Sequence, residues 1–405
     1  MRQSKLFTKT RKEAPSDEVS KNAILLTRAG FIHKEFAGVY SYLPLGLRVL
    51  KKIENIIREE MNAIGGQELL MTALQDSEIW KKTNRWDDKV VDNWFKTKLV
   101  NGNELGIANT HEEPITAMLT EFISSYKDLP LYVYQFQTKF RNELRAKSGI
   151  MRVREFLMKD LYSFSKTEEE FKEFYEKCAN AYMKIFARVG LGDRTYRTVA
   201  TGGSFTTNLT DEFQTLSEAG EDIIYITDED KKRAVNKEVE DKSVEGRKSI
   251  EVGNIFPYGS KYPDVFGLHF KDEKGERRPI FMGAYGIGLG RLMGTVVEVL
   301  SDEKGIVWPK EIAPFQVHLL SLSNKTKKFA DEIYQTLITK EVEALYDDRD
   351  VRAGEKFADA DLIGIPMCVV IGEKAIESNI LEVKDRASGK TKEITFEHLI
   401  NELKS

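Results

Sequence analysis

The clearest chemical group in the sequence is a set of charged residues around one predicted hairpin tip. Arg141 and Glu143 precede a basic loop, and Arg152, Arg154 and Phe156 follow it. Arginine makes planar, bidentate contacts to phosphate and carboxylate groups, and an aromatic ring can stack on a base. A carboxylate can accept a hydrogen bond from an exocyclic amine. These residue types suit a charged, nucleotide-like ligand. Two plainer interpretations stay open, in which the charges pair with one another or form a solvated sheet face.

Two strands must position this group. Residues 132–140 alternate aromatic with smaller or polar side chains, and residues 153–164 are again rich in aromatic and apolar side chains. The loop between them is short and basic, and it contains glycine. This pattern predicts an antiparallel hairpin with a basic tip.

A second polar string, Thr110-His111-Glu112-Glu113, precedes a proline. A helix start explains the string well, with Thr110 as the N-cap and the two acids in the first turn. His111 is a metal ligand in principle, but no other histidine or cysteine lies near it in the sequence. No metal is therefore expected at this histidine.

Four glycines, at positions 283, 286, 288 and 290, lie just before Arg291 and a predicted apolar helix over residues 293–300. Such glycines let a strand and a helix start pack closely, or let the backbone approach a ligand. The spacing matches neither the dinucleotide-binding fingerprint nor a phosphate loop with its lysine.

Helices and strands are predicted along the rest of the chain. Apolar residues at helical spacing predict a helix over 47–64, followed by a strand at 67–71. A further helix is expected over 166–189, whereas the charged stretch 228–249 is expected to be an exposed loop or a short helix. From residue 312 onward strands and helices alternate, as in a small α/β domain.

The composition indicates an ordinary globular protein. The 405 residues are 41% hydrophobic and 31% charged, and the net charge of −4 excludes a globally basic nucleic-acid coat but not a local basic groove. The two cysteines, Cys178 and Cys368, match no zinc spacing and no disulfide framework. With no apolar signal region and no membrane-length apolar run, a cytoplasmic protein is expected.

Taken together, these segments resemble the class II aminoacyl-tRNA synthetases. Residues 38–72, 132–164 and 279–300 are similar to motifs 1, 2 and 3 of that family and occur in the required order. The string 152–164 is most similar to the prolyl type found in bacteria. Motif 1 usually has a proline where this chain has Thr72.

The resemblance covers nearly the whole chain and implies an α/β (α+β) architecture. It implies an antiparallel-sheet catalytic core flanked by helices over residues 1–311. A mixed α/β anticodon-binding domain is implied over residues 312–405. Many bacterial relatives insert an editing domain where this chain has only residues 222–250, which are expected to form a short loop.

The resemblance also implies an activity, in which L-proline is attached to tRNA(Pro) through prolyl-adenylate, with release of AMP and pyrophosphate. ATP and Mg²⁺ are implied and zinc is not. Motif 1 implies a homodimer, and the missing insertion implies that any editing of alanyl-tRNA comes from a separate protein. Two alternatives stay open: an inactive synthetase-like tRNA-binding protein, and a class II enzyme for another amino acid. Threonine is disfavoured, because no zinc-binding Cys/His set is present.

The family motifs imply roles for particular residues, with Arg141 and Arg291 as the catalytic arginines. The residues implied for ATP are Arg141, Glu143, Arg152, Phe156 and Arg291. Those implied for proline are Thr110, Glu112, Arg141, Asp211 and Gly283, and Asp211 stands where relatives have a histidine. Glu212 is implied as a magnesium ligand or is a structural carboxylate of a strand. The residues implied for the tRNA anticodon are Arg349, Arg352, Lys356 and Asp359.

Overall fold

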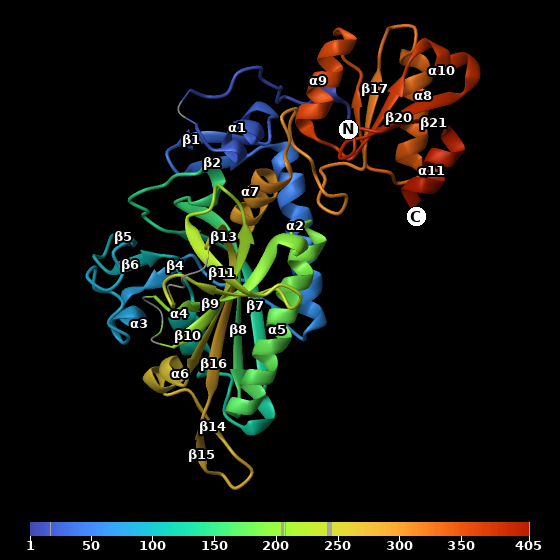
Figure 1. Ribbon diagram of the computed structural model, residues 1–405. Helices are drawn as coiled ribbons and strands as arrows, with labels where there is room; N and C mark the ends of the chain where they lie inside the picture. The colour runs from blue at the N-terminus through green and yellow to red at the C-terminus, as the bar shows by residue number, and fades with distance from the viewer. Residues whose placement is uncertain (17, 204–205, 207, 241–244, 405) are drawn as a thin grey trace. The chain divides into compact units, whose positions relative to one another are not determined.

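The computed structural model describes residues 1–16, 18–203, 206, 208–240 and 245–404, and these form two compact units (Figure 1). One unit contains Met1–Glu35, Tyr40–Lys52 and Val296–Ser405. The other contains Phe36–Val39 and Ile53–Thr295. No helix among the described residues is both long and apolar enough to cross a membrane.

The larger unit is built on one sheet, to which nine strands of the described residues contribute in the order β10-β9-β12-β11-β13-β16-β8-β7-β3. The bounds are β3 Gln67–Glu68, β7 Leu131–Phe140, β8 Glu155–Ser165, β9 Thr195–Thr201, β10 Leu209–Leu216, β11 Asp222–Asp228, β12 Arg233–Asn236, β13 Arg247–Gly259 and β16 Phe281–Gly288. Neighbouring strands are antiparallel except for β12 with β9 and β3 with β7. The predicted antiparallel-rich core is confirmed.

The predicted hairpin is confirmed as β7 and β8, whose register places Phe140 opposite Glu155 and Tyr132 opposite Ser163. Helix α5 (Glu168–Arg188) covers one face of this sheet (Figure 1). Its buried residues follow the helical spacing that predicted it. Phe174 of α5 stacks on Tyr132 of β7, with ring centroids 3.6 Å apart.

The opposite face of the sheet packs against helices α4 (Glu112–Leu119) and α6 (Lys261–Phe266). Side chains alternate along β16, as the two-residue period of a strand requires. The Sδ atom of Met282 lies 3.5 Å from the hydroxyl of Thr116 in α4, whereas the ring of Tyr285 contacts Phe174 in α5. We name these two sides the α4 face and the α5 face.

Several smaller elements complete the N-terminal two thirds of the chain. They are α1 Lys21–Arg28, β1 Ile32–Phe36, β2 Val39–Tyr42, α2 Pro44–Ala63, β4 Leu74–Asp76, α3 Ser77–Lys81, β5 Phe95–Lys98, β6 Glu104–Ile107, β14 His269–Lys271, β15 Arg277–Pro279 and α7 Leu289–Leu300. Helix α2 confirms the helix predicted over 47–64. Its predicted apolar face is buried except at Leu47, which is 45% exposed.

The C-terminal residues form a second sheet with the strand order β18-β17-β19-β20-β21. The elements are β17 Val317–Ser321, α8 Lys327–Thr339, β18 Ala344–Asp347, α9 Ala353–Ile363, β19 Met367–Ile371, α10 Glu373–Ser378, β20 Ile380–Asp385, β21 Thr391–Thr395 and α11 Phe396–Lys404. The predicted alternation of strands and helices is confirmed, and α10 and α11 are additional. Val317, Leu319, Val369 and Leu381 lie in the apolar core of this domain.

Three local predictions are wrong. The segment 222–250 is not simply a loop, because it contains β11, β12 and the start of β13, while residues 241–244 lie outside the described residues. Ala234 and Val235 are buried in β12, which pairs with β9 and β11 on its two sides. The strand predicted at 67–71 extends only over Gln67–Glu68. Thr110 is not the N-cap of α4, because the helix begins at Glu112 and His111 occupies the cap position.

Candidate active site

Arg141 and Phe156 lie beside each other at the loop end of the β7–β8 hairpin. The backbone N–H of Arg141 donates to the carbonyl of Arg154 at 2.8 Å, which continues the ladder beyond Phe140. The guanidinium carbon of Arg141 lies 5.4 Å from the centroid of the Phe156 ring. Burial and the Arg291 guanidinium lower the pKa of Arg141. Because no described carboxylate lies within ion-pair distance of the Arg141 guanidinium, this cation is available to an anionic ligand.

Arg152 and Glu143 form an ion pair across the loop of the hairpin. The Nε atom of Arg152 donates to Oε2 of Glu143 at 3.1 Å, and Nη1 lies 3.5 Å from Oε2 of Glu221. Lys147 also pairs with Glu221, at 2.9 Å. The mutual pairing that the sequence left open therefore holds for Arg152 and Glu143 and does not hold for Arg141.

Arg291, in the first turn of α7, joins the motif 3 segment to the hairpin loop and to β13. Its Nε donates to the carbonyl of Met151 at 3.0 Å, and its Nη1 donates to Oε2 of Glu251 at 3.0 Å. Its planar head is thus fixed by neighbours from two other segments.

The five residues predicted for ATP line one hollow on the sheet. These residues are Arg141, Glu143, Arg152, Phe156 and Arg291. Gly286 and Gly288 of β16 line the same hollow, and an adjoining hollow shares Glu143, Arg152 and Arg291. The structure therefore brings Arg141 and Arg291, which are 150 positions apart in the sequence, to one surface. This surface carries arginine cations as well as the aromatic ring of Phe156.

Acidic side chains lie at the edge of these hollows. Nε2 of Gln214 donates to Oε2 of Glu212 at 2.8 Å and to Oδ2 of Asp222 at 2.9 Å. Burial and the nearby Glu251 carboxylate raise the pKa of Glu212 to about 8, and burial raises the pKa of Asp222. These oxygens suit a hard cation such as Mg²⁺, whose charge would relieve the repulsion. Among the described residues no three acidic, histidine or cysteine side chains already form a metal-binding cluster.

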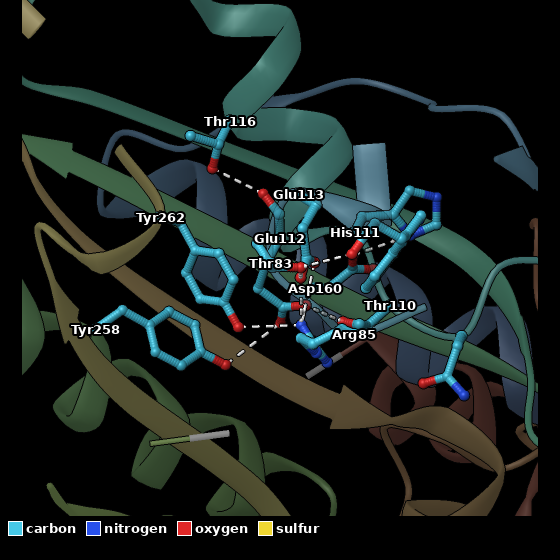
Figure 2. A network of polar contacts seen from close by, with 12 residues as sticks. Thr83, Arg85, Thr110, His111, Glu112, Glu113, Thr116, Asp160, Tyr258 and Tyr262 are labelled. Carbon is cyan, nitrogen blue, oxygen red and sulfur yellow. Dashed lines mark hydrogen bonds and ion pairs between the residues drawn. The ribbon is translucent and has the colours of Figure 1, made fainter. Parts of the chain in front are cut away.

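Thr110 and Glu112 form a buried polar site at the start of α4 (Figure 2). The Thr110 hydroxyl donates to Oε2 of Glu112 at 2.6 Å, and the Tyr258 hydroxyl donates to Oε1 at 3.4 Å. The Nε atom of Arg141 donates to the carbonyl of Asn109, the residue before Thr110, at 3.4 Å. The Arg141 guanidinium thus reaches the segment that carries Thr110 and Glu112.

Two charged networks around this site were missed from the sequence. In the first, Arg85 is 7% exposed and donates to both carboxylate oxygens of Glu113 at 3.0 Å and to the Tyr262 hydroxyl at 3.0 Å. Figure 2 shows Arg85 between these side chains and Glu112. A Thr83 hydroxyl also donates to Glu113 at 2.9 Å.

In the second network, Lys139 of β7 donates to Nδ1 of His111 at 2.6 Å and to Oδ2 of Asp160 at 2.9 Å. Because an ammonium can only donate, Nδ1 must accept, and the imidazole proton therefore lies on Nε2. That nitrogen lies 3.0 Å from the carbonyl of Thr72, to which it donates. Burial and the Lys139 charge lower the pKa of His111 to about 4, which keeps the ring neutral.

The contacts of Asp211 and Gly283 are with α5 and with Arg197. Asp211 accepts a hydrogen bond from Nη2 of Arg197 at 2.8 Å, and its backbone N–H donates to the Tyr175 hydroxyl of α5. A Cβ atom at Gly283 would lie 2.7 Å from the ring of Phe171, another residue of α5. Both positions therefore face α5, whereas Glu112 belongs to α4 itself.

Three of the four residues predicted for the anticodon, Arg349, Lys356 and Asp359, have side-chain partners within their own domain. Arg349 donates to Asp347 at 2.7 Å and to Asp359 at 2.8 Å. Lys356 is buried and donates to the carbonyls of Ser321 and Asp347. Arg352, the N-cap residue of α9, is exposed. Of the four predicted residues, Arg352 is the most accessible to RNA.

Comparison with known proteins finds a synthetase domain family for each of the two parts of the chain. The family described as "tRNA synthetase class II core domain (G, H, P, S and T)" matches residues 95–300, and the "Anticodon binding domain" matches residues 316–405. A "Proline--tRNA ligase" of Wolbachia sp. subsp. Drosophila simulans (strain wRi) is 39% identical over 99% of both chains. A protein of the same name from Rickettsia rickettsii (strain Sheila Smith) is 38% identical over 99% of both chains.

Solved structures show the same fold. The prolyl-tRNA synthetase from Cryptosporidium parvum, complexed with L-proline and AMP, superposes with a TM-score of 0.78 at 17% identity. The match covers 95% of this chain and 74% of that one. From its full-length similarity to the ligases of Wolbachia and Rickettsia, the chain belongs to the proline–tRNA ligase family of class II aminoacyl-tRNA synthetases.

Proposed function

We propose that this protein activates L-proline with ATP and transfers it to tRNA(Pro). The observation that carries the proposal is the arrangement of Arg141, which lies against the Phe156 ring of the predicted nucleotide surface and donates to the carbonyl of Asn109, beside Thr110 and the buried Glu112. The alternatives, an inactive tRNA-binding protein or a ligase for another amino acid, are not favoured by the full-length relatives.

In the first step, a carboxylate oxygen of proline attacks the α-phosphorus of ATP, and pyrophosphate leaves. Glu112 and Thr110 hold the imino group, while Arg141 lies between the carboxylate and the α-phosphate. The Phe156 ring stacks on adenine, and the Glu143 carboxylate accepts a hydrogen bond from the exocyclic amine of adenine. Arg152 and Arg291 bind the outer phosphates. Such transfers depend on positioning and charge stabilisation rather than on acid–base groups.

In the second step, a terminal ribose hydroxyl of the tRNA attacks the carbonyl carbon of the adenylate, and AMP leaves. Glu212 and Asp222, with Glu251 nearby, are the residues that would hold Mg²⁺. The ion supplies charge neutralisation on the phosphates when bound. Asp211 and Gly283 do not enter this mechanism as direct contacts with proline, because both face α5.

We assign residues 1–311 to the catalytic part and residues 312–405 to a domain that binds the anticodon. The two family matches support this division, although the compact units group Met1–Glu35 with the C-terminal residues. We further propose a cytoplasmic homodimer that uses the motif 1 segment, residues 38–72, as its interface. Sedimentation at micromolar concentration should give twice the chain mass, and a monomer would contradict the dimer.

The test of the function is amino-acid-dependent exchange between ATP and pyrophosphate, measured with each of the twenty amino acids. Proline alone should strongly stimulate exchange. Exchange with no amino acid would favour the tRNA-binding alternative, and robust exchange with another amino acid but not with proline would overturn the assigned substrate.

A further inference from the structure

The first turn of α4 carries two adjacent buried carboxylates, Glu112 and Glu113, and one buried guanidinium lies against both (Figure 2). Nη1 of Arg85 lies 3.0 Å from each oxygen of Glu113 but 3.6 Å from Oε2 of Glu112. The guanidinium is therefore engaged mainly by Glu113. Only a small movement separates it from Glu112.

The partners of the two carboxylates differ in kind. Besides Arg85, Glu113 accepts a hydrogen bond from the Thr83 hydroxyl. The hydrogen bonds to Glu112 come from neutral hydroxyls, those of Thr110 and Tyr258. Glu113 thus has the closer contact with Arg85, at 3.0 Å, whereas Glu112 lies 3.6 Å from the same nitrogen.

Two other buried cations near the site, Lys139 and Arg85, each have a carboxylate partner. Lys139 is paired with Asp160 at 2.9 Å, and Arg85 is paired with Glu113. Among the described residues, Arg141 has no carboxylate within ion-pair distance, and Glu112 has only the more distant contact with Arg85 at 3.6 Å. A zwitterionic amino acid carries the two complementary charges, since its imino cation matches Glu112 and its carboxylate matches Arg141.

We infer that Glu113 is a positioning residue that holds Arg85 away from Glu112 and so reserves the Glu112 carboxylate for the cationic nitrogen of the substrate. The inference rests on the proposed function. Without the Glu113 charge, Arg85 would turn to Glu112, because a buried guanidinium requires a carboxylate partner. The substrate cation would then have to displace it.

The test compares the KM for proline with kcat and with the KM for ATP in the exchange reaction of the full chain. Glu113→Gln should raise the KM for proline by about 10–100-fold, as expected if Arg85 occupies Glu112 in roughly 90–99% of molecules. The KM for ATP should change little, because the nucleotide hollow lies on other residues. Glu121→Gln, an exposed glutamate just beyond α4, is the matched control and should behave as the unsubstituted protein.

The double variant Arg85→Met, Glu113→Gln separates positioning from a merely structural role. It removes the competing cation together with the Glu113 charge, so that neither of these two positions keeps an unpaired buried charge. The KM for proline should therefore return to within about 3-fold of the original value. If Glu113→Gln alone does not fold, the KM for proline of the double variant still tests the inference.

Two results would overturn the inference. One is an unchanged KM for proline in Glu113→Gln while the unsubstituted protein is active. The other is a double variant whose KM remains raised by 10-fold or more. If the unsubstituted protein shows no proline-dependent exchange at all, the proposed function fails first, and the inference fails with it.

Discussion

Arg141 is the side chain whose removal should cost most in the activation step. It is the cation of the site without a carboxylate partner among the described residues, so its charge is directed to the reacting groups. Arg141→Ala should reduce proline-dependent pyrophosphate exchange by about 10²–10³-fold, the range for one preorganised charge stabiliser.

The exposed Arg145, four residues further along the hairpin loop, provides a comparison. Arg145→Ala should change exchange by less than about 3-fold and reduce tRNA charging more strongly, because loop tips are accessible to large ligands. Near-normal exchange in Arg141→Ala would show that this arginine is structural.

His111 should make the stability of the protein depend on pH. Its pKa is about 4 in the folded chain, below the ordinary value of 6.5, because of burial and Lys139. The unfolded chain therefore binds the proton first as the pH falls, and stability is lost between about pH 6.5 and pH 4. Between pH 7 and pH 5 this residue alone should remove about 2 kcal/mol from the free energy of unfolding.

Urea unfolding of the original chain and of His111→Gln at both pH values measures this effect. The difference between pH 7 and pH 5 should be about 2 kcal/mol smaller in the variant. Equal pH dependence in the two proteins would mean that folding does not lower the pKa of His111.

Residue types in one continuous string were predictable, and partners across the fold were not. Arg141, Glu143 and Phe156 carry a recognisable pattern within one hairpin. Arg85 and Lys139 occur in unremarkable stretches and acquire their meaning only when folding buries them against Glu113 and Asp160. The available signal was weak: a charged residue such as Lys139 within a strand that the aromatic alternation predicts to be buried.

At the level of elements, the short turn between β1 and β2 is hydrogen-bonded to the chain just before strand β8. The carbonyl of Gly38, between β1 and β2, accepts the N–H of Arg154 at 2.7 Å, and Arg154 in turn accepts the N–H of Arg141 at 2.8 Å. Gly38 has φ +74°, and a Cβ atom there would lie 2.4 Å from Cβ of Ala146 in the hairpin loop. The turn therefore fits against the loop only as glycine.

Gly38→Ala should displace the hairpin loop and lower exchange by about 10-fold or more, since small misplacements of reacting groups are costly. Gly102→Ala is the matched control, because Gly102 also has positive φ (+92°) but a Cβ atom there meets nothing within 4 Å. Both variants should lose about 1 kcal/mol of stability from the backbone conformation. Equal exchange rates in the two variants would contradict a role for the turn.

Strong periodicity predicted the elements correctly where it existed. The residues of α2, α5, β7 and β8 repeat apolar side chains at the spacing of a helix or a strand. The strand β12 was missed because it is short, contains only two apolar residues, Ala234 and Val235, and lies in a highly charged stretch. Its burial comes from pairing with β9 and β11, which local sequence does not reveal.

At the level of the whole molecule, we expect no site that hydrolyses mischarged tRNA, because residues 222–250 replace the editing domain of many bacterial relatives. The described residues of this segment join the main sheet as β11, β12 and the start of β13 instead of forming a separate core. Alanine is smaller than proline, and lost apolar contacts discriminate by only about 1–3 kcal/mol. The protein should therefore charge some alanine and should not hydrolyse it.

Incubation of the protein with preformed alanyl-tRNA(Pro) checks this expectation. The deacylation rate should equal the spontaneous rate. Faster hydrolysis would reveal a correcting site in the chain, and a stable product would place any correction in a separate protein.

The most direct test of the central claim is attachment of radiolabelled proline to tRNA(Pro) by the full chain. With ATP and Mg²⁺, proline should accumulate on the tRNA through an alkali-labile ester, and release of AMP should match the proline attached. Arg141→Ala should abolish most of this product. Failure to charge tRNA with proline, or preferential charging with a different amino acid, would contradict the proposed function.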